Sequence, residues 1–306
     1  MMKNKTIYII FLSLFSLLGL ISYLLIQKNI VEDNLNLLFF CFFLILIIGV
    51  SHGALDHLRG KKILEPIFKK SWYILFYPGY ISLSLIVIVC WILFPALTLL
   101  MFLLIASYHF GEEDLGFFYK GNGFIFNISS FLKGLLIITL AFHYSFDSTS
   151  IFFEYLLVPQ ESYENIIQFK SLFFSINLFL IIVGLIYLLR EQIDKLVLIL
   201  LEILFIILSF IYLPLILAFS LYFCFLHSSK HIIGLSKELD SENIINGLKL
   251  FSIKAIPLTL LTAVIALITV YYLDESLSRN IVQTIFIGLA SLTLPHILLE
   301  ILDRKK

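Results

Sequence analysis

Charge is the first property that this sequence lacks. Only 14% of its 306 residues are charged, and 21 basic residues balance 21 acidic ones. A formal net charge of zero excludes the strongly basic surface that attracts nucleic acid, so we expect no nucleic-acid partner. Polar stretches long enough to form a soluble domain are also missing, while 60% of the residues are hydrophobic. These absences predict a single integral membrane domain over residues 1–306.

Paired cysteines and a signal-peptide cleavage site are missing as well. Cys41, Cys90 and Cys224 lie in apolar runs without metal-type spacing, so neither a disulfide framework nor a cysteine-based zinc site is predicted. The first apolar run, 6–26, follows two lysines as a signal peptide would. However, its apolar part is too long, and no small-residue cleavage site follows it. We therefore expect 6–26 to remain as the first span.

What the chain has in abundance is apolar runs of about 20 residues, the length that crosses a bilayer as a helix. Charge clusters and prolines divide them into ten expected helices: 6–26, 35–53, 72–94, 96–111, 128–146, 171–189, 196–212, 214–234, 251–273 and 281–302. The divisions at Pro95 and Pro214 have almost no loop, so a kinked single helix is the alternative there. The stretches 72–111 and 196–234 are each too long for one span, which favours hairpins.

The basic residues are distributed unequally between the two sides of this arrangement. Eighteen of the 21 lysines and arginines fall on the side that holds both termini, and only Lys28, Lys170 and Arg279 fall on the other. The positive-inside rule then places both termini in the cytoplasm. The predicted fold is an all-α, polytopic transmembrane bundle in a cell membrane, with 35–302 as its main part.

Histidines recur at the ends of the even-numbered spans. Those at such ends are His52, His109, His227, His231 and His296. Because even-numbered spans run in the same direction, we expect these side chains at a similar depth near the cytoplasmic face. His143 lies near the end of an odd-numbered span, so it is expected on the far side and outside any shared site.

The spacing of His227 and His231 is that by which a helix offers two nitrogens to one metal ion. Two interfacial polar residues that reach toward water are the alternative for this pair alone. The other histidines at the same depth favour a metal site, because ionisable groups within a membrane are costly and usually functional.

A carboxylate follows three of the histidines by four residues. The pairs are His52 with Asp56, His109 with Glu113, and His296 with Glu300. Metal-bound imidazoles usually donate their second N–H to such an acceptor, so we expect each carboxylate to orient the histidine of its own helix. The alternative is that these acids only mark the wet ends of helices.

Four separated motifs resemble the Brp/Blh family of membrane β-carotene 15,15′-dioxygenases, in the family's order. They are SHGALDH (51–57), SYHFGEEDLG (107–116), FLHSSKH (225–231) and TLPHILLE (293–300). The resemblance implies Fe²⁺ ligands at His52, His109, His227 and His231. It also matches His57 and His296 to motif histidines that are either additional ligands or supporting residues. The first span resembles an addition to the family's common core, which leaves 35–302 as the catalytic bundle.

The resemblance further implies that β-carotene is cleaved with O₂ at its central double bond into two molecules of retinal. Imidazole suits several metals, but this oxidation needs a metal that changes redox state, which excludes zinc. The implied setting is a bacterial inner membrane, with a retinal-binding rhodopsin as a functional partner. The aromatic residues expected to line a polyene channel are Tyr108, Phe110, Phe223 and Phe225, with ordinary packing as the alternative in a chain that is 16% aromatic.

Two other functions compete with this interpretation. A membrane di-iron hydroxylase or desaturase would need more clustered histidines than five or six at one face, unless carboxylates join the site. A proton- or metal-coupled transporter would place polar residues near the middle of the membrane on broken helices. Here the ionisable groups gather toward one face instead.

Overall fold

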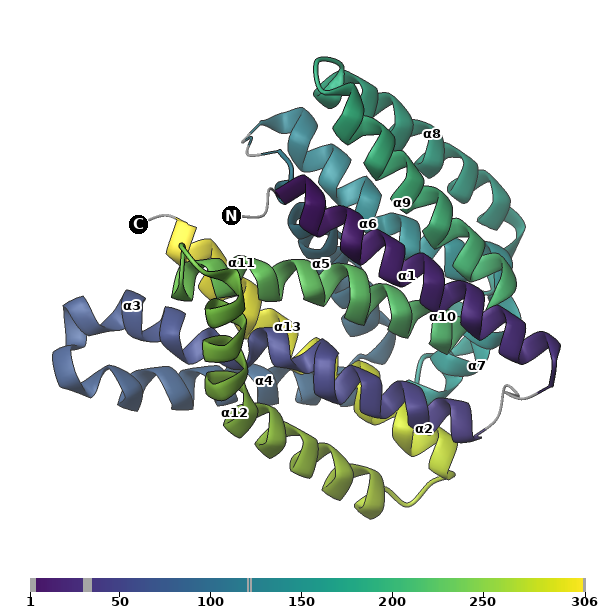
Figure 1. Ribbon diagram of the computed structural model, residues 1–306. Coiled ribbons are helices and arrows are strands. Elements are labelled where there is room, and N and C mark those ends of the chain that lie inside the picture. The colour runs from purple at the N-terminus through teal and green to yellow at the C-terminus, as the bar shows by residue number, and fades with distance from the viewer. Residues whose placement is uncertain (1–3, 30–34, 120, 122, 305–306) are drawn as a thin grey trace.

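The computed structural model describes residues 4–29, 35–119, 121 and 123–304, and within these ranges the regular structure is entirely helical (Figure 1). The helices in chain order are α1 (Asn4–Gln27), α2 (Leu35–Leu44), η1 (Ile45–Gly49), η2 (Val50–Leu55), α3 (Asp56–Phe68), η3 (Lys69–Ser71), α4 (Trp72–Leu93), α5 (Pro95–Gly116), α6 (Phe124–Tyr144), α7 (Phe146–Tyr155), η4 (Gln160–Ser162), η5 (Glu164–Phe169), α8 (Lys170–Leu189), α9 (Ile193–Tyr212), α10 (Leu215–Leu221), η6 (Tyr222–Ser228), α11 (Ser229–Leu239), α12 (Ile244–Tyr272) and α13 (Leu277–Arg304).

In the described part of the chain, nine helical stretches are long and apolar enough to cross a membrane. Eight of them each correspond to one expected span, and the ninth, Leu35–Leu93, contains the two expected at 35–53 and 72–94. In that stretch α2 continues through η1 and η2 into α3, and α4 returns beside α3 (Figure 1). The predicted all-α, polytopic bundle is confirmed.

The backbone settles the two proline divisions in favour of hairpins. Phe94, between α4 and α5, has φ −139° and ψ 61°, and Leu213, between α9 and α10, has φ −115° and ψ 152°. Neither residue is helical, and α4 packs against α5 as α9 does against α10. Pro95 begins α5, where the missing N–H costs no helical hydrogen bond. A new helix therefore begins at Pro95 and directly after Pro214.

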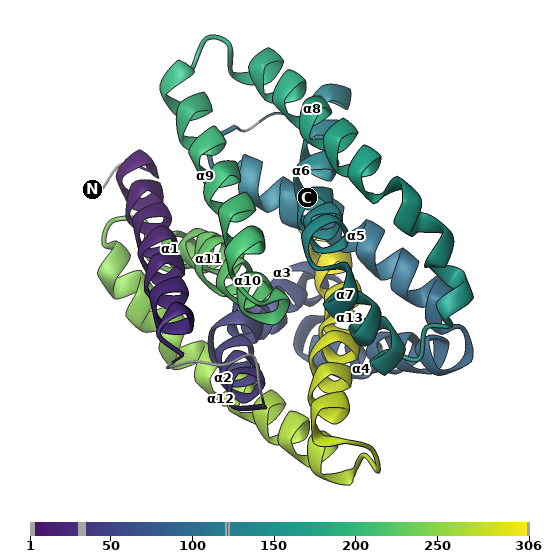
Figure 2. The same cartoon turned by 90° about the vertical axis from the view of Figure 1, so that its right-hand side faces the viewer.

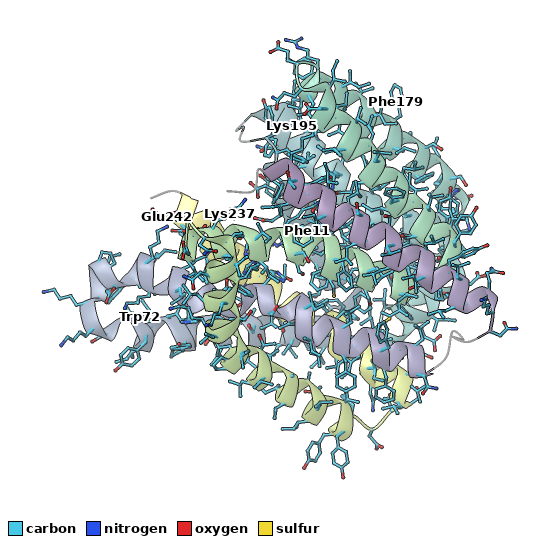
Figure 3. The ribbon with its side chains drawn as sticks, in the orientation of Figure 1. Phe11, Trp72, Phe179, Lys195, Lys237 and Glu242 are labelled. Carbon is cyan, nitrogen blue, oxygen red and sulfur yellow. The ribbon has the colours of Figure 1, made fainter. Side chains whose placement is uncertain are left out.

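The outside of the bundle is apolar along its helices. Leu260, Val264 and Ile268 of α12 are all exposed, and Phe179 points away from α8 (Figure 3). Such a surface is stable in lipid and not in water. The start of α1 and the end of α13 lie on the same side (Figure 1), as the ten expected spans predict. Which compartment that side faces stays a prediction.

Two features of the packing position the centre of the bundle. First, α13 runs through its middle and contacts α2, α3, α4, α5, α7 and α12 (Figure 2). Second, α5 and α6 approach so closely that a Cβ on Gly111 would lie 1.6 Å from the carbonyl oxygen of Ser130. A Cβ on Gly134 would lie 1.8 Å from the carbonyl oxygen of Ser107. Glycine permits this contact, which sets the position of α5 just beyond His109.

Candidate metal centre

Five histidines from different parts of the chain meet inside the bundle. They come from η2 (His52), α5 (His109), η6 (His227), α11 (His231) and α13 (His296). Contacting imidazoles in this histidine cluster have ring centroids 5.1–5.6 Å apart. The predicted convergence of the first four is therefore present in the structure. His296, which the sequence left undecided between ligand and support, lies among them.

Irregular helical turns carry two of these histidines. His52 lies in the 3₁₀ segment η2, which follows the π-helical turn η1, and His227 lies in the π-helical turn η6. Wide π-turns inside membrane helices are rare and often occur at functional sites, because one extra residue per turn re-aims the side chains. The packing of Phe223 against His52 and His227 joins the two irregular segments.

The cluster contains buried nitrogen atoms without hydrogen-bond partners. His109, His227, His231 and His296 are buried, while His52 is partly exposed. Among the described residues, nothing hydrogen-bonds to Nε2 of His231, Nε2 of His296 or either nitrogen of His227. Unpaired buried polar atoms are costly, so several together call for a ligand that accepts their lone pairs. A metal ion fits this requirement.

Two groups within the cluster have the spacing of metal ligands. Donor atoms of His52, His109 and His296 lie within 4.8 Å of one another, and so do those of His231, His296 and Glu300. His296 belongs to both groups, so it is the residue that joins them. Neutral imidazoles with one such carboxylate form a donor set that suits a divalent transition metal.

The three carboxylates contact histidines of other helices, which corrects the predicted pairing within each helix. The observed pairs are Asp56 with His296 Nδ1 at 2.8 Å, Glu113 with His231 Nδ1 at 3.1 Å, and Glu300 with His109 Nδ1 at 3.3 Å. His52 instead uses Nδ1 toward the carbonyl oxygen of Gly49, with Ser228 Oγ at 3.3 Å. Nδ1 thus lies near an oxygen in His52, His109, His231 and His296, whereas Nδ1 of His227 has no such partner among the described residues. The carboxylates still support histidines, but different ones.

Helix geometry explains why the predicted pairing was wrong. His52 lies in a 3₁₀ segment, where residues three apart eclipse one another, so Asp56 is not stacked above it. In the other helices each histidine points toward the common centre. The carboxylate one turn further on therefore reaches the neighbouring helix. Glu300 also keeps a contact with the histidine of its own helix, at 3.8 Å from His296 Nε2.

Two polar side chains that the sequence did not single out complete this shell. Arg59 of α3 donates to Glu300 Oε1 at 2.6 Å, and Tyr80 of α4 donates to Asp56 Oδ2 at 2.9 Å. Arg59 is one of the 18 basic residues on the side of the termini, and the sequence predicts only that it marks the cytoplasmic side. Its contact with a nearly buried carboxylate gives it a second role, which is to hold Glu300 in place.

The remaining two histidines differ from the cluster. His57 Nδ1 lies 3.1 Å from the carbonyl oxygen of Ala54, and its side chain lines the cavity described next. His143, at the end of α6, stacks on Phe174 with ring centroids 4.8 Å apart and lies 3.3 Å from Ser171 Oγ. His143 therefore takes no part in the cluster, as its position in an odd-numbered span predicts.

A cavity of about 390 Å³ opens beside the cluster and is lined mainly by apolar side chains of α4, α5, α6, α7, α12 and α13. His52, His109 and His296 form part of its wall. Phe110 and Phe223 line it as expected.

Tyr108 and Phe225, also expected to line the channel, are not among its lining residues, which corrects that prediction. Neighbouring helical residues point in different directions, so a run of aromatics cannot face one cavity. The Tyr108 hydroxyl instead lies 3.4 Å from Glu112 and from Asn127. Phe225 packs against the hydrophobic core.

Comparison with known proteins agrees with this geometry. The sequence model of a family described as "Beta-carotene 15,15'-dioxygenase" matches residues 43–303, a range that includes the whole histidine cluster and leaves α1 outside. A curated relative of the same description, from uncultured marine bacterium 66A03, is 28% identical over 267 residues, which cover 84% of this chain and 90% of the relative. No solved structure matches the chain.

Proposed function

Because the chain belongs to the beta-carotene 15,15′-dioxygenase family, we propose that it cleaves β-carotene with O₂ at the central 15,15′ double bond and releases two molecules of retinal. One observation carries this proposal. A cluster of buried imidazoles with unpaired nitrogen atoms adjoins a large apolar cavity inside a membrane bundle, and His296 belongs to both. That combination suits a redox reaction on a hydrocarbon that dissolves in lipid.

We propose Fe²⁺ as the cofactor, held by His52, His109, His227 and His231, with His296 as a further donor. Ferrous iron bound there would supply the one-electron chemistry that reaction with O₂ requires. The protein's part is to present neutral imidazoles. A carboxylate only accepts hydrogen bonds, so a histidine that donates through Nδ1 keeps a free lone pair on Nε2.

The walls of the cavity support entry of the substrate from the lipid. Ile81 of α4 and Ile265 of α12 line the cavity and are also exposed on the outside of the bundle. A carotenoid can therefore enter sideways between α4 and α12, without crossing water. The apolar lining also excludes water from the reacting double bond, which limits side reactions.

The length of the cavity supports cleavage at the centre of the substrate. Leu99 of α5 and Phe286 of α13 line it ten residues before His109 and His296, respectively. At 1.5 Å per residue, the cavity therefore extends about 15 Å along these helices from the histidines. One half of the C40 chain can lie along this stretch while the other half extends toward Ile81 and Ile265 on the outside of the bundle. The central double bond would then lie at the cluster.

The decisive experiment is product analysis with purified protein in detergent, loaded with Fe²⁺ and supplied with β-carotene and O₂. We expect two retinal molecules per β-carotene, and none when O₂ is excluded or Zn²⁺ replaces Fe²⁺. Unequal apocarotenal products would reject central cleavage. A hydroxylated carotenoid of full length would favour the hydroxylase alternative.

A further inference from the structure

A second buried cluster lies next to the histidines and takes no part in the cavity wall. It contains two carboxylates and two ammonium groups, all at most 3% exposed, from α5 (Asp114), α6 (Lys133), α9 (Glu202) and α11 (Lys230). We call these four residues the charge ring. Its formal charges cancel, and none of its members lines the cavity. Neither the motifs nor the family resemblance assigns it a role.

The charge ring is closed, because each ammonium group bridges both carboxylates. Lys133 Nζ lies 2.6 Å from Asp114 Oδ2 and 2.7 Å from Glu202 Oε1. Lys230 Nζ lies 2.9 Å from Asp114 Oδ1 and 2.8 Å from Glu202 Oε2. All four carboxylate oxygens are thus engaged by a cation. Such short, charge-assisted contacts restrict distance and direction at once.

Two tyrosines complete the hydrogen bonding of the charge ring. The Tyr222 hydroxyl donates to Asp114 Oδ2 at 3.1 Å, and the Tyr8 hydroxyl donates to Glu202 Oε2. The ammonium group of Lys230 also lies 5.2 Å from the centroid of the Tyr8 ring. Each carboxylate therefore receives two ammonium groups and one phenol. Through Tyr8, the ring includes α1, which packs against α9 and η6 (Figure 1).

The charge ring is directly connected to the histidine cluster along the chain. Lys230 immediately precedes His231, and Asp114 immediately follows Glu113, which lies 3.1 Å from His231 Nδ1. Two successive residues of α5 therefore contact two successive residues of α11. A helix held at two adjacent positions can neither rotate nor slide without breaking one of the contacts. The orientation of His231 is fixed in this way.

The energetics of buried ions indicate what such an arrangement is for. Removing one partner from a buried ion pair is strongly destabilising, but replacing the whole group with apolar residues of similar volume is often neutral or stabilising. Stability alone is therefore a poor reason for burying four charges. The four charges instead fix one geometry, because only one arrangement satisfies all their donors and acceptors.

We propose that the charge ring positions η6 and α11, so that His227 and His231 meet the metal ion at the correct distance. This inference rests on the proposed metal function and adds four positioning residues outside the cluster, together with Tyr8 and Tyr222. It also gives a role to the first span, which resembles an addition to the family core. Tyr8 of α1 donates a hydrogen bond to the charge ring, which positions two of the proposed ligands.

The test separates positioning from stability by replacing the entire charge ring. The fourfold variant carries Asp114→Leu, Lys133→Met, Glu202→Met and Lys230→Met. We expect it to fold in detergent with a melting temperature equal to or above that of the unaltered protein. We also expect it to bind Fe²⁺ roughly 10–100-fold more weakly, as when groups that orient metal ligands are lost. Chelator competition measures the affinity, and the visible spectrum of the Co²⁺-loaded protein reports ligand geometry.

A folded fourfold variant with unchanged Fe²⁺ affinity and an unchanged Co²⁺ spectrum would overturn the inference. If this variant does not fold, Tyr8→Phe with Tyr222→Phe decides, since it removes two hydrogen bonds and no charge. We expect it to keep its melting temperature and bind Fe²⁺ several-fold more weakly, and unchanged affinity would again overturn the inference.

A matched control is available on α1 and α9. Asp194→Asn breaks the exposed pair that Lys5 forms with Asp194 at 2.8 Å, and it should leave metal affinity unchanged. Failure of the unaltered protein to bind Fe²⁺ would reject the proposed function, and with it the role of the charge ring. Normal binding by both the unaltered protein and the folded ring variants would reject the positioning role alone.

Discussion

His296 donates from Nδ1 to both carboxylate oxygens of Asp56, at 2.8 and 2.9 Å, although the two residues are 240 positions apart. This contact joins the last helix to the start of α3. Tyr80 donates to the same carboxylate, so Asp56 is held in place from a second helix. The proton on Nδ1 leaves Nε2 of His296 as a lone-pair donor that faces the cluster.

Asp56→Asn should lower Fe²⁺ affinity by roughly 10–100-fold without abolishing binding, because the amide oxygen still accepts the hydrogen bond but carries no charge. Added Fe²⁺ should partly restore activity. When His296 is already replaced by Ala, Asp56→Asn should cause little further loss of Fe²⁺ affinity. When His52 is replaced instead, Asp56→Asn should cause nearly its full loss, because Asp56 contacts His296 and not His52. Chelator competition on the single and double variants measures this. A larger coupling to His52 than to His296 would contradict the observed pairing.

Alanine at His52, His109, His227 or His231 should abolish retinal formation while the protein still inserts in the membrane. Each change removes one imidazole ligand from the metal site, and added Fe²⁺ cannot replace a missing ligand. His296→Ala should also abolish retinal formation, because His296 belongs to both groups of residues that have the spacing of metal ligands. Retinal is measured by chromatography after incubation with β-carotene. His143→Ala is the control and should retain activity. Near-normal activity in one of the other variants would remove that residue from the ligand set.

Gly111→Ala or Gly134→Ala should destabilise the protein by about 3 kcal/mol, because the added methyl group would overlap backbone atoms of the facing helix. Thermal unfolding in detergent measures the change. Gly79→Ala and Gly288→Ala are matched controls, since nothing lies within 4 Å of the added Cβ at either position. Equal stability in all four variants would show that α5 and α6 do not approach as closely as the structure indicates.

Thr262→Phe should reduce retinal formation by roughly 10-fold or more while leaving Fe²⁺ bound, because the larger side chain occupies space that the substrate needs. Val264→Phe, two residues further along α12 on the exposed surface, is the control. Initial rates and iron content are measured on both proteins. Similar rates for the two variants would indicate that the polyene does not occupy this cavity.

Much of the site follows from the order of the spans. Alternate spans run in the same direction, so histidines at the ends of even-numbered spans must share a depth, and the structure brings five of them together. The helical bundle follows equally from the apolar runs. The π-turns at η1 and η6 could not be predicted, because the apolar runs do not distinguish a π-turn from the α-helix around it.

The partners of the charged groups were also beyond the sequence. Spacing along one helix suggested that Asp56 supports His52, but contacts between helices depend on how each helix is rotated, and a single sequence does not contain that information. The charge ring did leave a signal. Lys133 and Glu202 lie inside apolar runs, where a charge needs a partner. Lys133 is one of the 18 basic residues on the side of the termini, and the positive-inside rule alone does not reveal that it is buried and paired.

Iron K-edge X-ray absorption on the purified, Fe²⁺-loaded protein tests the central claim most directly, because it reports which atoms hold the metal. The account predicts a shell of four or five nitrogen atoms at roughly 2.0–2.2 Å, with the outer scattering typical of imidazole rings, and a smaller shell in the His231→Ala protein. A shell made mainly of oxygen atoms, or one unchanged by His231→Ala, would contradict it.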